Sequence, residues 1–354
     1  MTRAHALDRL IGDSLPALRS AADVQAFEAS AHYEERIAAQ STYEALQLGA
    51  AIAPDAPALQ FIASAESLEP AVTLSHAQFL ARVTQAGNLF HAHGVGPQDV
   101  VSFLLPLLPQ AYFGLFGAQV AGIANPVNPL LSPHQLAEIL RAARTKVLVT
   151  IGPQPGSDIW EKVQQIRAEL PELAVVLVIG GAADPAKGVH GFDSELAKQP
   201  ADRIVSGRRI LASDIAGYFH TGGTTGTPKL VRHTHANQVY QAWGLRFTLP
   251  MSRGNVLCGL PLFHVGGSLT QGLATLANGS CIVTLTPSGW RDAGMVRSAW
   301  KLVERYRPVV FGGVPTVLAA ALGVPVDGAD ISSVRVATGG GSAIPVAVGQ
   351  AYQR

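Results

Sequence analysis

The residues with the clearest chemical potential form a short glycine- and threonine-rich segment in the second half of the chain. Three glycines and four threonines occupy residues 221–227, and Lys229 follows them. Small side chains leave backbone N–H groups free to surround phosphate oxygens, while threonine hydroxyls and a lysine ammonium add donors and positive charge. The pattern predicts a phosphate-binding loop, and an ordinary glycine-rich turn is the alternative interpretation.

The spacing of this segment excludes the two commonest nucleotide-binding motifs. A Walker loop has glycine directly before its lysine and serine or threonine directly after it, whereas Pro228 precedes Lys229 here and Leu230 follows it. The glycine spacing of the dinucleotide fingerprint is also absent from the loop. The sequence therefore disfavours an ordinary phosphate-binding NTPase.

The segment from Tyr218 to Lys229 resembles the phosphate-binding signature of the adenylate-forming enzymes, which include the acyl-CoA synthetases. That signature is Thr-Ser-Gly-Thr-Thr-Gly-x-Pro-Lys-Gly, and the chain departs from it at Gly222 and Leu230. Because Gly222 replaces a serine, one potential phosphate donor is lost. The matching residues are Thr221, Gly223, Thr224, Thr225, Gly226, Pro228 and Lys229.

Further segments resemble the family in the order in which the family has them. They are residues 72–74, 94–101, 121–129, 260–267, 314–316 and 339–345. A lone histidine in an apolar run is usually a core residue, but its place in segment 260–267 gives His264 a functional interpretation. The resemblance covers roughly residues 50–354.

The resemblance implies a reaction in two halves. A carboxylic acid, fatty or aryl, attacks the α-phosphate of ATP to give an acyl-adenylate and pyrophosphate, and the thiol of CoA then displaces AMP. The implied cofactors are ATP, Mg²⁺ and CoA, with Mg²⁺ near Thr224. Lys229 and His264 are the implied catalytic residues, His264 orienting the carboxylate beside the acyl pocket. The implied nucleotide-binding residues are Thr221, Gly222, Gly223, Thr224, Thr225, Gly226, Lys229, Gly340, Gly341 and Ser342.

Two alternatives stay open within this interpretation. The acyl-adenylate could be passed to the thiol of a carrier protein in place of CoA, or the chain could be a catalytically silent module that binds a nucleotide or an acyl group. The length and type of the acyl group are not determined by the sequence, since the pocket is built from scattered residues.

The elements that must position these residues alternate between apolar strands and amphipathic helices. This order predicts an α/β fold of mostly parallel sheets with helices on both faces. Residues 100–137 lack Asp, Glu, Lys and Arg, but prolines and glycines interrupt them, so we expect buried core and no membrane span. Residues 182–210 are expected to form a loop. The expected strands are 58–62, 72–74, 100–105, 147–151 and 174–179. The expected helices are 75–93, 109–120, 132–143 and 161–170, and Ser75 and Ser132 are the expected N-caps of the first and third of them.

Three parts are expected along the chain: a helical extension over 1–48, a first α/β subdomain over 49–215, and a second, incomplete one over 216–354. The family's adenine-stacking segment, its Mg²⁺-binding Glu and its C-terminal domain are not found up to Arg354. The chain is thus expected to be an incomplete large N-terminal domain that cannot complete the reaction alone. Uncovered apolar surface near 330–354 is expected to cause self-association, a homodimer being one form.

The bulk composition bounds the remaining function classes. With 354 residues, 48% of them hydrophobic and 14% charged, the chain can bury a large core. A net charge of +1 gives no electrostatic reason to expect nucleic acid or an anionic membrane as a partner. Cys258 and Cys281 lack the spacing of a disulfide framework or a metal site, and the first residues lack a secretory apolar core. These features predict a cytoplasmic protein, and the family resemblance implies a ligase of fatty acid metabolism.

Overall fold

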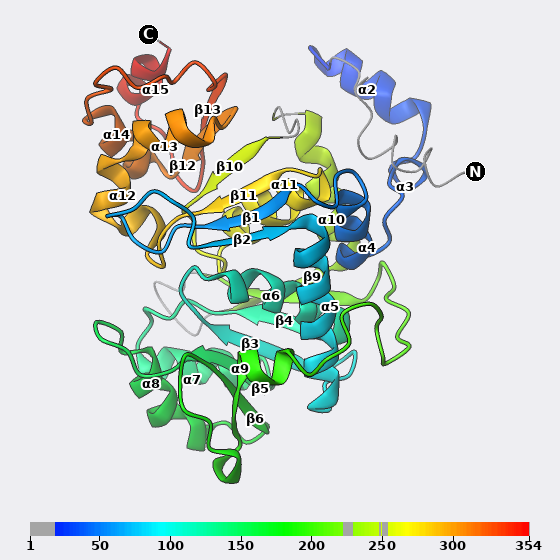
Figure 1. Ribbon diagram of the computed structural model, residues 1–354. Coiled ribbons are helices and arrows are strands. Elements are labelled where there is room, and N and C mark those ends of the chain that lie inside the picture. Colours follow the sequence, from blue (N-terminus) through cyan, green and yellow to red (C-terminus); the bar gives the residue numbers. More distant parts are fainter. Residues whose placement is uncertain (1–17, 222–228, 248, 250–253, 354) are drawn as a thin grey trace.

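The computed structural model describes residues 18–221, 229–247, 249 and 254–353. The described residues form three β-sheets. In Figure 1 the four-stranded sheet lies above the seven-stranded sheet, and the two-stranded sheet lies at the upper left. The predicted residues Gly222, Gly223, Thr224, Thr225 and Gly226 lie outside the described residues, as do residues 1–17 of the expected extension.

The largest sheet has seven strands in the order β7-β6-β5-β3-β4-β8-β9. All neighbours are parallel except β8 and β9, which form an antiparallel pair. Its central strands β3 and β5 consist mostly of buried apolar residues, as expected for parallel strands covered on both faces. The strands are β3 (Val100–Leu104), β4 (Ile123–Pro126), β5 (Thr145–Ile151), β6 (Val175–Ile179), β7 (Val189–Gly191), β8 (Ile215–His220) and β9 (Leu230–Thr234).

Two smaller sheets complete the described fold. The four-stranded sheet has the order β10-β11-β1-β2, with β2 antiparallel to β1, and the two-stranded sheet pairs β12 and β13 in parallel. The prediction of an α/β fold with mostly parallel sheets is therefore confirmed. The strands are β1 (Pro57–Phe61), β2 (Val72–Ser75), β10 (Asn255–Cys258), β11 (Cys281–Thr284), β12 (Val310–Gly313) and β13 (Val336–Gly339).

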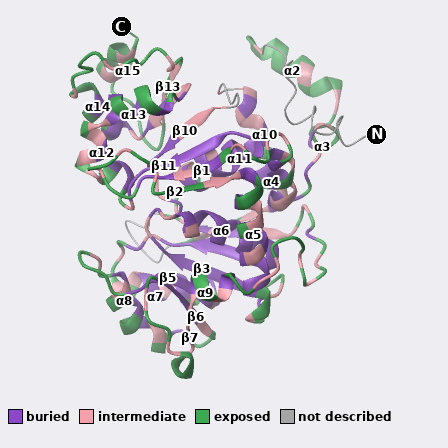
Figure 2. Ribbon diagram, in the orientation of Figure 1, coloured by how far each residue is buried: buried purple, intermediate pink, exposed green. Residues whose placement is uncertain are grey.

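Helices cover the sheets and fill the space between the two larger ones. Helices α5 (His76–Ala92) and α6 (Pro109–Ala121) lie between them, and α7 (Pro133–Ala142) and α8 (Ile159–Ile166) pack beside β5 (Figure 1). The expected cap Ser75 accepts a hydrogen bond from the N–H of Gln78. Strand β11 and helix α6 are purple in Figure 2, as are most central strands of the seven-stranded sheet, and one cluster of buried residues reaches both large sheets.

The chain near residues 100–137 is buried core, as predicted, and consists of β3, α6, β4 and the start of α7. Among the helices of the described ranges, none combines the length and apolarity that crossing a bilayer requires.

Residues 182–210 were expected to be a loop, and this prediction is wrong in part. The segment contains β7, which extends the seven-stranded sheet, and the short helix α9 (Phe192–Leu196). Val189, Phe192 and Leu196 are buried and anchor both elements. Only a few apolar residues stand among glycines and polar residues here, so the sequence shows no periodicity that would have revealed them.

The sheets do not follow the expected division at residue 215. Strands β8 and β9 belong to the seven-stranded sheet, and β1 and β2 pair with the later strands β10 and β11. Within the expected extension, α4 (Thr42–Ala50) is part of the core, because Ala45 and Leu46 are buried and Gly49 packs directly against Leu276 in α11 (Ala274–Ala277).

The helices before α4 attach to the body through aromatic side chains. Phe27 of α2 (Ala21–Ser30) lies 5.2 Å from the ring of Phe247, and Tyr33 of α3 (Tyr33–Arg36) lies 5.2 Å from that of Tyr240 in α10 (His235–Gly244). The remaining helices are α12 (Ala293–Arg297), α13 (Ala299–Tyr306), α14 (Pro315–Leu322) and α15 (Val346–Tyr352), together with a π-helix over Gly266–Leu273.

Candidate active site

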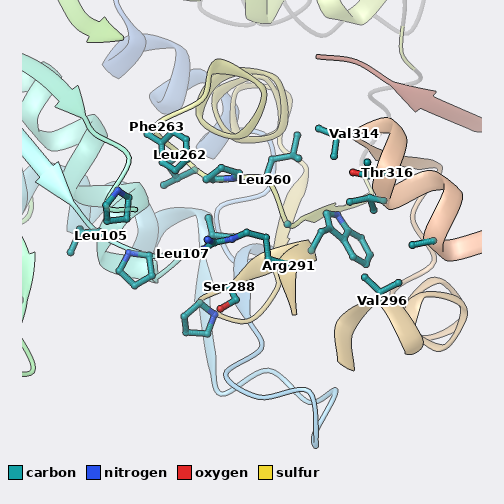
Figure 3. A pocket seen from close by; sticks show the side chains of 18 residues that line it. Leu105, Leu107, Leu260, Leu262, Phe263, Ser288, Arg291, Val296, Val314 and Thr316 are labelled. Atoms are coloured by element: carbon teal, nitrogen blue, oxygen red, sulfur yellow. The ribbon is translucent and has the colours of Figure 1, made fainter. Parts of the chain in front are cut away.

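A pocket of about 510 Å³ lies where the carboxyl ends of strands from all three sheets meet. Segments that follow β3, β4, β10, β11 and β12 line it, and ligands of α/β proteins characteristically bind at such strand ends. Figure 3 shows Leu105 and Leu107 on one side and Val314 and Thr316 on the other.

The lining of this pocket is largely apolar, with one exposed cation. Arg291 follows the buried Trp290 and is the only charged residue among the described residues of the lining. Figure 3 shows its side chain reaching across the centre of the pocket near Leu260. A guanidinium on an apolar wall attracts carboxylate or phosphate oxygens. Sequence analysis missed Arg291, since no motif marks it.

His264 stands at the entrance of the π-helix, directly after the pocket residue Phe263. Its imidazole is exposed, and its Nδ1 accepts a hydrogen bond from the N–H of Gly266 at 3.1 Å. The neutral ring therefore carries its proton on Nε2 and can donate it to a ligand. Gly267 is confined between the carbonyls of Leu260 and Pro261, where a side chain would clash, so the tight turn that presents His264 requires glycine.

The ends of the predicted phosphate-binding loop are held by the antiparallel pair β8 and β9. The N–H of Thr221 donates to the carbonyl of Lys229 at 2.9 Å, which closes the chain into a hairpin at the end of β8. Both residues are exposed. Residues 222–228 are outside the described residues, so the phosphate role of Gly222–Gly226 stays a prediction.

His220 connects this hairpin to the pocket, and sequence analysis did not single it out. Its Nε2 accepts a hydrogen bond from the N–H of Asn128 at 3.1 Å, and its ring stacks on Phe263 with 6.0 Å between centroids. Burial lowers the pKa of His220, which favours the neutral ring that this hydrogen bond needs. A histidine at the end of an apolar strand is usually a core residue, so the sequence held no signal beyond its place before Thr221.

The predicted adenine loop follows β13 and borders the same pocket. Gly340, Gly341 and Ser342 are exposed, and Gly341 has a φ of +87°, a conformation that favours glycine. A side chain at Gly341 would contact Val314 of the pocket, whereas one at Gly340 would meet nothing within 4 Å. The structure thus brings this loop, His264 and the ends of the phosphate loop to the edge that holds the pocket.

The two cysteines are buried and form no disulfide bond. Their thiols stay protonated near neutral pH, so neither cysteine supplies a thiolate to the site. Burial raises the pKa of Cys258 to about 11 and that of Cys281 to about 12. Among the described residues, no group of three or more His, Cys, Asp or Glu side chains could hold a metal ion.

Comparisons with known proteins show the family to which the chain belongs. The sequence pattern of the AMP-binding enzyme family matches residues 46–354. The chain is 33% identical over 334 residues to the marinolic acid–CoA ligase of Pseudoalteromonas sp. (strain SANK 73390), covering 93% of this chain and 50% of that protein. It is 26% identical to the long-chain-fatty-acid–CoA ligase of Bacillus subtilis (strain 168), covering 79% of this chain and 53% of that protein.

Solved structures of low sequence identity share the fold. An anthranilate CoA ligase in complex with anthranoyl-AMP gives a TM-score of 0.76 at 24% identity, over 88% of this chain and 57% of that chain. The N-terminal domain of FACL13 from Mycobacterium tuberculosis gives 0.73 at 22% identity, over 89% of this chain and 73% of that chain. The chain spans about half the length of the curated relatives it matches, and the predicted N-terminal domain fold is confirmed.

Proposed function

Because this chain belongs to the AMP-binding enzyme family and is of the acyl-CoA ligase type, we propose that the protein activates a carboxylic acid with ATP and transfers the acyl group to CoA. The observation that carries the proposal is that three elements adjoin residues of one pocket: His220 at the start of the phosphate hairpin stacks on Phe263, His264 follows Phe263 in the chain, and Gly341 of the loop after β13 lies beside Val314. A fatty or aryl acid suits the apolar lining of that pocket.

In the first half-reaction the acid attacks the α-phosphate, and negative charge shifts toward the departing pyrophosphate. Lys229 and the hydroxyls and N–H groups of residues 221–226 would bind the β- and γ-phosphates and stabilise that charge. The hairpin closed by Thr221 and Lys229 supports this role, because it holds both ends of the loop at the pocket edge before the ligand arrives.

His264 would orient the acid for this attack. Its Nε2–H is available for one carboxylate oxygen while the other attacks, and the hydrogen bond from Gly266 keeps the ring in that tautomer. Arg291 would draw the anionic acid or nucleotide into the apolar pocket. Gly340, Gly341 and Ser342 would lie against the adenine and the acyl group, where the absence of bulky side chains allows close approach.

The described residues around the pocket would not hold Mg²⁺ by themselves, so the ion would bind there together with the phosphates of the nucleotide. No carboxylate occurs among the described residues of the lining. Mg²⁺ is commonly held by substrate phosphates and water with few protein ligands, so a hydroxyl such as that of Thr224 would suffice on this part of the chain. When bound, the ion would neutralise phosphate charge.

The test of this proposal is carboxylate-dependent ATP–pyrophosphate exchange, followed by thioester formation with CoA, in the protein expressed from its own gene. Fatty and aryl acids are compared, and acyl-adenylate and acyl-CoA are separated by chromatography. We expect exchange with at least one acid class and CoA-dependent release of AMP. Nucleotide binding without exchange for any acid would instead identify a silent binding module, and acyl-adenylate that CoA does not consume would indicate transfer to a carrier protein.

A further inference from the structure

A second, smaller cavity of about 60 Å³ lies beside the π-helix, and we call it the inner cavity. Strand β10 lines it through Asn255–Leu257, and β12 lines it through Val310 and Gly312. The segments that continue these two strands line the large pocket. The π-helix that closes the inner cavity begins two residues after His264. The two cavities therefore share strands β10 and β12, and His264 lies in the chain between the pocket residue Phe263 and the π-helix.

Two side chains that line the inner cavity carry buried polar atoms without a partner. Gln271 of the π-helix is 8% exposed and Thr275 of α11 is 0% exposed. Neither Gln271 Oε1 nor Thr275 Oγ1 has a hydrogen-bond partner within the part of the chain that the structure describes. Buried polar groups are nearly always paired, and leaving one unpaired destabilises a protein. Both atoms therefore call for a ligand or a solvent group in the cavity.

The neighbouring residues show that this polar character is confined to the inner cavity. The hydroxyl of Thr270, also in the lining, accepts a hydrogen bond from Gln241 Nε2 at 3.2 Å, so its oxygen already has a partner. The large pocket is lined mostly by apolar side chains. Since a water molecule has a share of about 30 Å³ in the liquid, the inner cavity has room for one small oxygen-bearing group.

We propose that the inner cavity receives the far end of the acid, and that Gln271 and Thr275 select acids carrying a hydroxyl group there over plain hydrocarbon acids. This inference rests on the proposed function. A hydroxyl donates and accepts, so it satisfies Gln271 Oε1 and the threonine hydroxyl together. A methyl end would fill the same space and leave both unpaired, and sites built to hydrogen-bond a substrate discriminate strongly against analogues that cannot.

The experiment uses acyl sulfamoyl-adenosines, which are non-hydrolysable analogues of acyl-adenylates, in pairs of equal tail length. One member of each pair has a plain alkyl tail and the other has a terminal hydroxyl, and a series of lengths is tested. Affinity for the chain is measured by isothermal titration calorimetry. We expect the hydroxylated member to bind about ten- to a hundredfold more tightly at the length that reaches the cavity.

Two variants assign this preference to the named atoms. Thr275→Val removes a hydroxyl at constant shape, and Gln271→Met removes the amide at similar length, so each should abolish most of the preference without weakening the alkyl analogue. Thr284→Val is the control, because Thr284 is also a fully buried threonine but does not line either cavity. The control should keep the full preference.

Each outcome decides the question. Equal affinity for both tails at every length, or tighter binding of the alkyl tail, would overturn the inference while leaving acyl-adenylate binding and the proposed function intact. An unchanged preference in both cavity variants would also overturn it. If no analogue binds, the proposed function itself fails. The comparison of tails on the unmodified chain needs no substitution, so a variant that does not fold leaves the test complete.

Discussion

The large pocket has two walls of different construction. The first, which we call the seven-stranded wall, consists of residues after β3 and β4, and the hairpin that carries His220, Thr221 and Lys229 belongs to the same sheet. The second, the small-sheet wall, consists of the segments after β10, β11 and β12 and includes Arg291. His264 follows its residue Phe263 in the chain, and Gly341 lies beside its residue Val314.

The same residue type behaves differently on the two walls. His220 is held by a backbone donor and by a stacked ring, and it supports its neighbours. His264 is exposed, is turned by a glycine-rich bend, and has its Nε2 available for a ligand. Burial and hydrogen bonding, more than residue type, therefore distinguish a histidine that supports the site from one that is available to bind a ligand.

The largest expected effect is on the seven-stranded wall. Lys229→Ala or Thr225→Val should lower the adenylation rate by more than it weakens ATP binding, because their interactions strengthen as charge moves to pyrophosphate. A lost donor of this kind costs on the order of 2–4 kcal/mol, or roughly 30- to 1000-fold. Thioester formation from supplied acyl-adenylate involves no β- or γ-phosphate and should be nearly unchanged. Rapid-quench kinetics of each half-reaction measures both rates.

The exposed Lys301 of α13 provides the matched control for this experiment. Lys301→Ala should leave both half-reactions unchanged. Equal losses in the two half-reactions of Lys229→Ala, with an intact circular dichroism spectrum, would contradict a phosphate role.

A smaller effect is expected for His264→Ala on the small-sheet wall. Losing the Nε2–H donor should lower kcat/KM for the acid by about 10- to 100-fold and leave the affinity for ATP alone unchanged. The exposed His134 of α7 is the control, and His134→Ala should behave as the unmodified protein. An equal loss of ATP affinity would show that the two walls do not divide the ligands as proposed. Steady-state kinetics and equilibrium ATP binding are the measurements.

A third prediction concerns stability and pH at His220. His220→Phe keeps a ring on Phe263 but leaves the Asn128 N–H without its acceptor, so the free energy of unfolding should fall by about 1–3 kcal/mol near neutral pH. Burial lowers the folded-state pKa of His220 below its ordinary value of 6.5. Its contribution is therefore complete above pH 6.5 and decreases as the pH falls toward the folded-state pKa, because the unfolded chain takes up the proton first.

Urea unfolding at several pH values tests this prediction. The variant should lose stability less steeply than the unmodified protein as the pH falls below 6.5. Parallel curves for the two proteins would mean that His220 does not titrate as its burial requires.

The smallest effect is expected for Arg291→Gln. An exposed cation contributes about 0.2–1 kcal/mol to an ion pair in water, so anionic acids should bind at most a few-fold more weakly. The loss should disappear at high ionic strength, because salt screens exposed charges. Arg297→Gln, on the neighbouring helix α12, is the control. A loss that persists in high salt would place Arg291 in direct contact with the ligand.

Much of the fold could be predicted from local pattern. The continuous apolar runs near Val100 and Val147 predicted buried parallel strands, and Ser75 and Ser132 marked helix starts that the structure confirms. The family resemblance rested on segments whose order along the chain is preserved, and the match over residues 46–354 confirms it. These features are local, because a strand buried on both faces shows as a short apolar run and a helix cap shows as a single serine before the helix.

Only the tertiary structure decided which distant segments share a surface. Asn128, His220 and Phe263 are far apart in the chain and meet because parallel strands bring their carboxyl ends to one edge. In the same way, strand β1 pairs with β11, which lies more than 200 residues later in the chain. No local sequence pattern predicts this pairing. By itself the sequence determined several strands and helices of the first half of the chain. The order of the strands depends on contacts between residues that are remote in the chain. This order decided which segments line the pocket, so only the tertiary structure showed it.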